Sequence, residues 1–212
     1  MNVGVLVSGS GTNLQALIDR GKRNELGPAR LTVVGCNVPD CPALARARLA
    51  GLPTFIVDHR DHADRASFDR ALVEALRAHQ VDLVVLAGFM RVLSGELLDA
   101  FPGRVINIHP ALLPSFPGVH GVRQAYEAAV KIAGCTVHFV DRGVDTGPII
   151  AQAAVPMLDD DDDEALRARI LAEEHRLLPA VVRAIAERRV VLEGRRVRVL
   201  GAAPGIEPLR TL

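Results

Sequence analysis

Two short apolar runs near the middle of the chain, Leu83–Ala87 and Val105–Ile108, most constrain the fold that the sequence can adopt. Both runs are rich in β-branched residues, and each is bounded by glycine, proline or polar residues. Runs of this length and composition are typical of buried strands in a parallel sheet, which is covered on both faces. We therefore predict two central strands of such a sheet at these positions.

Polar side chains occur where the second run ends. Asn107 and His109 are two residues apart, so their side chains leave the same face of an extended segment. In open parallel sheets, ligands bind outside the carboxyl ends of the strands. An amide and a titratable imidazole would therefore point together into one crevice, and we expect the chemistry there.

The remainder of the first half alternates between similar apolar runs and helical patterns, in which apolar residues recur every three or four positions. This alternation predicts an α/β protein with a doubly wound, mostly parallel sheet and right-handed crossovers, a Rossmann-like arrangement. We expect strands at Val3–Val7, Leu31–Gly35 and Thr54–Val57, and helices at Leu14–Ile18, Pro42–Ala50, Asp64–His79 and Gly95–Ala100.

The pattern changes after His109. Pro110, Pro114 and Pro117 exclude regular structure and predict an ordered loop over the site. Two later apolar runs follow one another without a helix between them, which predicts an antiparallel C-terminal extension of the sheet. We expect a helix at Val122–Val130, strands at Thr136–Val140 and Ile149–Val155, a helix at Ala165–Leu178 that Pro179 kinks or ends, its continuation at Val181–Ile185, and a hairpin of Val190–Leu192 with Val197–Val199.

The length of 212 residues is enough for one substantial α/β domain, which we expect over residues 1–200, with a loosely held tail at 201–212. Basic and acidic residues both number 25, and this zero net charge argues against a nucleic-acid partner. No apolar run approaches the roughly 20 residues of a membrane span. The first strand leaves no room for a signal peptide, so we expect a cytoplasmic protein.

Cysteines and acidic residues give no sign of a metal site. Cys36, Cys41 and Cys135 form no C-x-x-C pair, and we predict buried reduced thiols. The acidic run Asp159–Asp163 lacks the glycine of a calcium loop, so we interpret it as a solvated helix start. We find no convincing cluster of metal ligands and expect none to be needed.

A glycine-rich turn, Ser8–Asn13, separates the first strand from the first helix. A strand, a glycine turn and a helix start together present free backbone N–H groups to an anion. Thr12 or Asn13 could cap the helix and still offer a donor. The turn lacks the ending of a P-loop and the third glycine of a dinucleotide fingerprint. A phosphate site is favoured, and a simple tight connection is the alternative.

Taken together, four motifs resemble the phosphoribosylglycinamide formyltransferases, a family of folate-dependent enzymes of purine synthesis. The resemblance covers residues from Val3 to about Val182. The motifs are Ser8–Ala16, Leu86–Arg91, Asn107–Pro110, and Gly134–Val140 continuing into Asp145.

The resemblance implies roles for particular residues. Asn107, His109 and Asp145 match the catalytic residues of the family, while His138 fits either support of this trio or plain packing. The ribonucleotide would bind at Gly11, Thr12, Asn13, Leu14 and Glu174. The folate would bind at Arg65, Met90, Arg91, Val92, Leu93, Asn107, Asp141, Arg142, Gly143, Val144 and Asp145. Ser115 stands where some relatives carry lysine, and Thr12 where others carry serine.

The implied reaction moves a formyl group from 10-formyltetrahydrofolate to the amine of glycinamide ribonucleotide. Attack by the amine produces an oxyanion, to which Asn107 and protonated His109 would donate. Asp145 would keep His109 charged and help to remove the amine proton. We expect only small-molecule substrates, no membrane or nucleic-acid partner, and a monomer or homodimer.

Three alternatives stay open. A hydrolase of 10-formyltetrahydrofolate would use water in place of the amine, but that family carries an additional N-terminal domain. Formylation of methionyl-tRNA would need an RNA-binding domain, against which the neutral charge argues. An inactive nucleotide-binding relative would not need Asn107, His109 and Asp145 together.

Overall fold

Five of the predicted strands lie in the first half of the chain and pair in parallel. The computed structural model describes residues 1–201. It orders these strands β3-β2-β1-β4-β5, and each neighbouring pair is parallel. Their bounds are Asn2–Val7 for β1, Arg30–Cys36 for β2, Thr54–Ile56 for β3, Leu83–Leu86 for β4 and Val105–His109 for β5.

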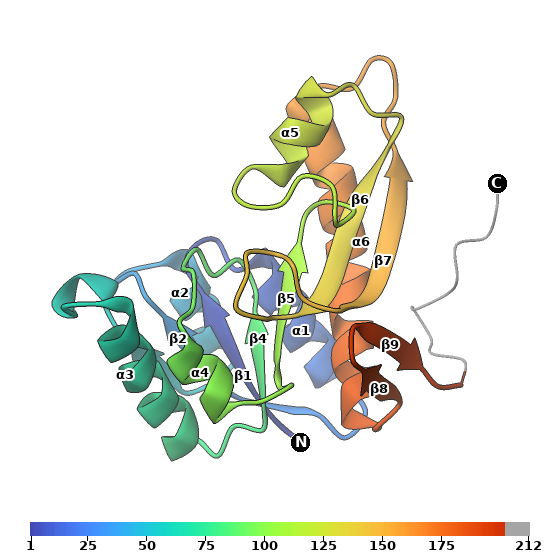
Figure 1. Ribbon diagram of the computed structural model, residues 1–212. Helices are drawn as coiled ribbons and strands as arrows, with labels where there is room; N and C mark the ends of the chain where they lie inside the picture. Colours follow the sequence, from blue (N-terminus) through green and yellow to red (C-terminus); the bar gives the residue numbers. More distant parts are fainter. Residues whose placement is uncertain (202–212) are drawn as a thin grey trace. The chain divides into compact units, whose positions relative to one another are not determined.

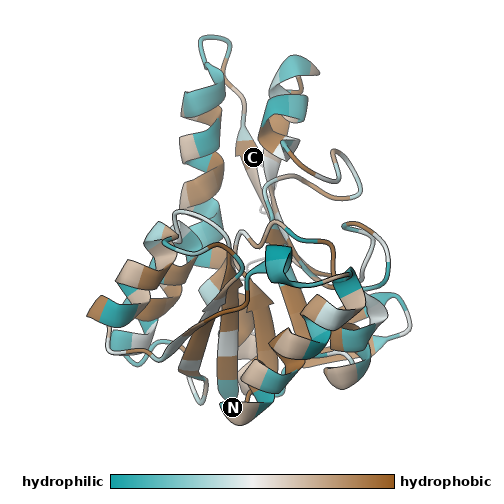
Figure 2. Ribbon diagram, turned by 90° about the vertical axis from the view of Figure 1, so that its left-hand side faces the viewer, coloured by the Kyte–Doolittle hydropathy of each residue, from teal (hydrophilic) through white to brown (hydrophobic). Residues whose placement is uncertain are grey.

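Helices alternate with these strands and bury them from both sides. Helix α1 packs against α2, and α3 packs against α4. Figure 2 shows the apolar strands between two groups of helices. Strand residues such as Val5, Val34 and Val85 are fully buried, as expected for a sheet covered on both faces. The bounds are Thr12–Lys22 for α1, Pro42–Leu49 for α2, Arg65–Ala78 for α3 and Gly95–Ala100 for α4, with a short 3-10 turn, η1, at His59–Asp61.

The second half of the chain contains two antiparallel pairs of strands (Figure 1). Helix α6 packs against both β6 and β7. The hydrogen-bonded strand order is β3-β2-β1-β4-β5-β6-β7, with β8 and β9 forming a separate hairpin. The bounds are Gly121–Glu127 for α5, Ile132–Phe139 for β6, Ile149–Pro156 for β7, Asp163–Ala186 for α6, Val190–Glu193 for β8 and Arg196–Val199 for β9.

The predicted α/β class, the mostly parallel sheet and the antiparallel extension are confirmed. Several boundaries differ from the prediction, and two of the differences have a clear physical cause. Strand β6 begins at Ile132 rather than Thr136, because Gly134 pairs with Ala154 instead of breaking the strand. Helix α6 runs through Pro179 without ending. Leu178, Pro179 and Val181 are all buried, and this apolar burial offsets the hydrogen bond that proline cannot donate.

The acidic run forms the start of α6, as predicted. The Asp162 side chain accepts a hydrogen bond from the Ala165 N–H and caps the helix. Asp161, however, is held by two guanidinium nitrogens of Arg169 and its side chain is buried rather than solvated. Paired donors of arginine match a carboxylate, which accounts for this difference.

The three cysteines are free and buried, as predicted. Burial, together with a hydrogen bond to Cys41, raises the pKa of the Cys36 thiol to about 12. A thiol of this kind is a weak nucleophile at neutral pH.

The chain divides into two compact units, residues 1–107 and residues 108 onward, with the boundary inside β5. The single domain over residues 1–200 therefore stays a prediction. Most of the predicted tail at 201–212 lies outside the described residues, which end at Gly201. In the described part of the chain, no helix is long and apolar enough to span a membrane.

Candidate active site

The turn between β1 and α1 contains a glycine at which any larger residue would be strained. Gly11 is the N-cap residue of α1 and has left-handed backbone angles, φ 72° and ψ 30°. A Cβ atom at this position would lie 2.5 Å from the Cβ of Ala43. Within residues 1–201, no side-chain hydrogen bond caps this helix. The prediction that Thr12 or Asn13 caps α1 is therefore wrong, and both are helical residues.

The same turn borders a small cavity within the first unit. The cavity has a volume of about 160 Å³, and its lining comes from the turn and from the segment that follows β4: Ser8, Gly9, Ser10, Gly11, Thr12, Asn13, Ala87, Gly88 and Met90. The first N–H groups of a helix have no partners within the helix and carry a partial positive charge. A cavity at the start of α1 therefore has the size and polarity to receive an anionic group.

Replacing Gly11 with alanine is expected to destabilise the protein by about 1–3 kcal/mol, because alanine is strained at the left-handed φ of this position and its Cβ would collide with Ala43. Urea unfolding measures this loss. Gly9→Ala is the matched control, since a Cβ at Gly9 meets no atom within 4 Å and its φ is not left-handed. Equal losses in the two variants would contradict the steric explanation.

The segment after β4 is held against the turn by Ser8. The Ser8 Oγ accepts a hydrogen bond from the Met90 N–H at 2.8 Å and donates one to the Asn37 Oδ1 at 2.6 Å. The Ser8 N–H donates to the Gly88 carbonyl at 3.1 Å. One hydroxyl thus connects the turn with the start of the segment at residues 90–93.

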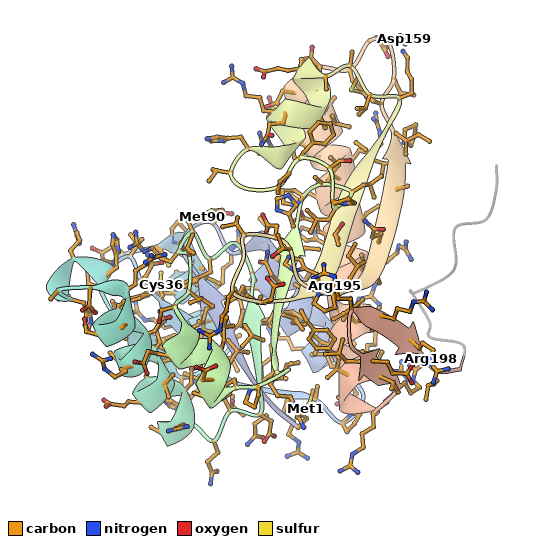
Figure 3. The ribbon with its side chains drawn as sticks, in the orientation of Figure 1. Met1, Cys36, Met90, Asp159, Arg195 and Arg198 are labelled. Atoms are coloured by element: carbon orange, nitrogen blue, oxygen red, sulfur yellow. The ribbon has the colours of Figure 1, made fainter. Side chains whose placement is uncertain are left out.

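Residues 90–93 form an irregular segment with alternate residues exposed. Met90, labelled in Figure 3, is 69% exposed and Val92 is 49% exposed, whereas Leu93 is buried. Among the described residues, no hydrogen bond pairs the backbone groups of Arg91, Val92 or Leu93. The segment therefore offers apolar side chains and backbone hydrogen-bonding groups to a ligand.

The second unit brings His109 and Asp145 together. His109 ends β5 and is buried, and its Nδ1 lies 3.3 Å from the Asp145 Oδ2. On the other side of the ring, Nε2 lies 2.8 Å from the Phe116 carbonyl oxygen. Both ring nitrogens therefore face oxygen atoms that only accept hydrogen bonds. The charged imidazolium, with two N–H groups, is the form that donates to both.

Asp145 is surrounded by donors. It accepts a hydrogen bond from the Gly118 N–H at 2.8 Å, and the His138 Nε2 lies 3.5 Å from its Oδ1. Burial raises the pKa of Asp145, but the hydrogen bonds from His138 and Gly118 and the charge of His109 outweigh it and lower the pKa below its usual range. Asp145 also has a left-handed φ of 53°. Such strain in a residue other than glycine is common at functional sites.

Asp145 belongs to a loop that is ordered by its own side chains. The Asp141 Oδ1 accepts hydrogen bonds from the Gly143 N–H and the Thr146 hydroxyl, at 3.0 and 2.6 Å. The Arg195 guanidinium donates to the Thr146 carbonyl at 2.7 Å. The loop therefore presents its one inward carboxylate, Asp145, in a fixed position beside His109.

A comparison with protein families matches residues 1–182 to the model described as formyl transferase. The chain belongs to the formyl transferase family. It is 49% identical over 191 residues to a phosphoribosylglycinamide formyltransferase of Mycobacterium tuberculosis, covering 90% of this chain and 87% of that protein. It is 51% identical over 178 residues to the trifunctional purine biosynthetic protein adenosine-3 of Drosophila melanogaster, covering 84% of this chain but 13% of that much longer protein.

A solved structure agrees with this formyl transferase along nearly its whole length. Glycinamide ribonucleotide transformylase 1 from Symbiobacterium toebii superposes with a TM-score of 0.93 and is 55% identical in sequence. The alignment covers 95% of this chain and 94% of that one. The predicted family is thus confirmed, and with it an enzyme that transfers formyl groups in purine biosynthesis.

The remaining predicted site residues of this formyl transferase have varied surroundings. Arg65 is exposed at the start of α3, and Arg142, Gly143 and Val144 are exposed in their loop. Glu174 is buried on α6. Leu14 is fully buried in the core, so only its backbone could serve a ligand.

Several contacts in this formyl transferase could not be found from sequence. The Phe116 carbonyl and the Gly118 N–H are backbone groups of the proline-rich loop, and their only signal was the spacing of the prolines. The sequence left open whether His138 supports the trio or only packs in the core. Its contact with Asp145 favours support of the trio. Among residues 1–201, no group of three or more His, Cys, Asp or Glu side chains is arranged to hold a metal ion.

Proposed function

We propose that this formyl transferase moves the formyl group of 10-formyltetrahydrofolate to the primary amine of glycinamide ribonucleotide, in de novo purine biosynthesis. The observation that carries the proposal is the contact of buried His109 with largely buried Asp145, with Asn107 two residues before His109 on the same strand. The high identity to proteins named for this reaction supports it.

In the proposed mechanism the substrate amine is the nucleophile, so no serine or cysteine of the enzyme is required. Asn107 donates to the oxyanion that develops on the formyl group. The imidazolium of His109 donates to the same oxygen with one of its two N–H groups, which then leaves the acceptor that it has in this structure, the Phe116 carbonyl or Asp145. One such donor typically contributes about 10²–10³ in rate. Asp145 stabilises the charged His109 and accepts the proton released by the amine, directly or through water. When the tetrahedral carbon collapses, its bond to the folate nitrogen breaks, and that nitrogen takes up a proton and leaves as tetrahydrofolate.

The ribonucleotide phosphate is proposed to bind at Gly11, Thr12 and Asn13, with the Leu14 backbone and Glu174 completing the contacts of this substrate. The cavity at the start of α1 supports the phosphate position. A helix start offers N–H donors and a positive partial charge to such a group. The buried carboxylate of Glu174 would suit hydroxyl groups or the amine of the same substrate.

The folate is proposed to bind at Arg65, at Met90–Leu93 and at Asp141–Asp145, with Asn107. The unpaired backbone groups of Arg91–Leu93 fit the hydrogen-bonding edge of a heterocycle, and exposed Met90 and Val92 fit its apolar face. When bound, this co-substrate supplies the activated formyl group. The residues of the chain bind it, orient it and exclude water.

We further propose that the enzyme works in the cytoplasm on these small molecules, without a metal, nucleic-acid or membrane partner. Its assembly as a monomer or a homodimer is part of the same proposal. Zero net charge is consistent with the lack of a nucleic-acid partner.

Incubation of the purified protein with both substrates tests the function. We expect tetrahydrofolate and formylated ribonucleotide to appear in equal amounts, and neither to form when one substrate is omitted. Release of formate from the folate alone would instead identify a hydrolase. A protein that is inert with both substrates would overturn the assignment.

Replacing Asn13 with alanine is expected to raise the Michaelis constant for the ribonucleotide by roughly 10- to 100-fold, the cost of losing a hydrogen bond to a charged group. The Michaelis constant for the folate serves as the internal control and is expected to change little. Steady-state kinetics with each substrate varied in turn measures both. Equal changes for the two substrates would contradict a phosphate site at this turn.

A further inference from the structure

Helix α3 contacts the segment after β4 through two consecutive residues. The ring of Phe68 stacks on that of Phe89, with centroids 6.4 Å apart and planes 8° from parallel. The next residue, Asp69, accepts two hydrogen bonds on its Oδ2, from the Ser94 N–H at 2.5 Å and the Ser94 hydroxyl at 2.8 Å. Residues 90–93 therefore lie between two points that α3 holds.

Asp69 is an unusual residue for this position, because it is fully buried. Burying a carboxylate is costly unless hydrogen bonds compensate, and a buried apolar side chain would pack at less cost. Ser94 supplies both donors, while the Oδ1 has no hydrogen-bond partner among the described residues. Burial raises the pKa of Asp69, and the Ser94 donors act in the opposite direction. Both hydrogen bonds of the carboxylate therefore go to Ser94, while the charges of Arg65 and Glu96 have smaller effects on its pKa.

The opposite end of the segment is held by the Ser8 hydroxyl on the Met90 N–H. Between the two ends, Leu93 is buried while Met90 and Val92 are exposed. The backbone groups of residues 91–93 make no hydrogen bonds of their own within the described structure. The conformation of this stretch therefore depends on its ends and not on internal pairing.

We propose that Asp69 is a positioning residue for the folate, acting by holding Ser94 so that residues 90–93 keep their ligand-binding conformation. The proposal rests on the proposed function, in which this segment binds the co-substrate. Asp69 itself does not touch the reacting atoms. We expect Asp69 to affect the Michaelis constant for the folate and not that for the ribonucleotide, because it holds the segment only at Ser94, the end away from the glycine turn.

Kinetics of Asp69→Asn and Asp69→Ala test this role. The asparagine keeps the shape and one acceptor oxygen, so we expect the Michaelis constant for the folate to rise about tenfold, and roughly 10- to 100-fold with alanine. The constant for the ribonucleotide is expected to change little in both variants. Glu74→Gln, an exposed acid on the same helix, is the matched control and is expected to match the parent.

Amide hydrogen exchange separates positioning from general destabilisation. In Asp69→Asn we expect faster exchange at Ser94 and at residues 91–93, with unchanged protection in β1 and β4. If Asp69→Ala does not fold, Ser94→Ala takes its place, because it removes the hydroxyl donor and keeps the carboxylate. This variant is also expected to raise the Michaelis constant for the folate. Lower stability with an unchanged folate constant would overturn the proposal. A wrong proposed function would give a different result from a wrong role of Asp69, because the parent enzyme itself would then form no product.

Discussion

Replacing Asp145 with asparagine is expected to lower kcat by about 10²–10⁴-fold while both substrates still bind. The substitution keeps the size of the side chain but removes the charge that faces His109 at 3.3 Å. A neutral amide no longer favours the imidazolium, so the oxyanion loses a charged donor and the amine loses its proton acceptor. Because the loss falls mainly on the transition state, kcat is expected to change far more than either Michaelis constant.

Steady-state kinetics and NMR of the His109 ring nitrogens check this expectation together. At the same pH the variant is expected to show a larger neutral fraction of the ring than the parent, because the carboxylate that favours the charged ring is gone. Asp160→Asn, an exposed acid in the same unit, is the matched control and is expected to leave kcat unchanged. If the protonation of His109 were the same in parent and variant, Asp145 would act on the amine proton alone.

Replacing Asn107 with alanine is expected to lower kcat by about 10²–10³-fold, the effect of removing one oxyanion donor. Both Michaelis constants are expected to change much less, because the bond forms fully only in the transition state. Stopped assays at saturating substrates measure the loss. Combined with His109→Ala, the two losses are expected to be smaller than additive, since the residues serve one developing charge.

The neighbouring residue on the same strand provides the control for Asn107. Ile108 is buried on the alternate face of β5, and Ile108→Val removes one methylene group. We expect a cost of about 0.5–1.5 kcal/mol in stability and no change in kcat. A comparable loss of kcat in this variant would show that any disturbance of β5 is sufficient, and would remove the specific role of Asn107.

Sequence alone predicted those features that depend on local patterns. The β-branched runs predicted strands β4 and β5. Asn107 and His109 lie at the end of the second run, and the structure has both on β5. The role of Asp145 came from the family resemblance, and the structure places it against His109.

Features that depend on distant residues could not be predicted. The cap of α1 is Gly11 because Ala43, far along the chain, occupies the space of a side chain. The apolar spacing of α3 gives no information on Asp69, because its partner Ser94 lies 25 residues further along the chain. The sequence of α6 gave no measure of the apolar burial that carries it through Pro179.

The Ser8 hydroxyl has a consequence for how two ligands could influence each other. Ser8 directly follows β1 and begins the glycine turn, and its Oγ accepts the hydrogen bond of the Met90 N–H. A single oxygen atom therefore connects the turn with residues 90–93. A ligand that moves the turn relative to residues 90–93 changes the length of this hydrogen bond, and thereby the free energy of that segment. By thermodynamic linkage the effect is mutual: each ligand changes the affinity of the other by the same factor, whichever arrives first.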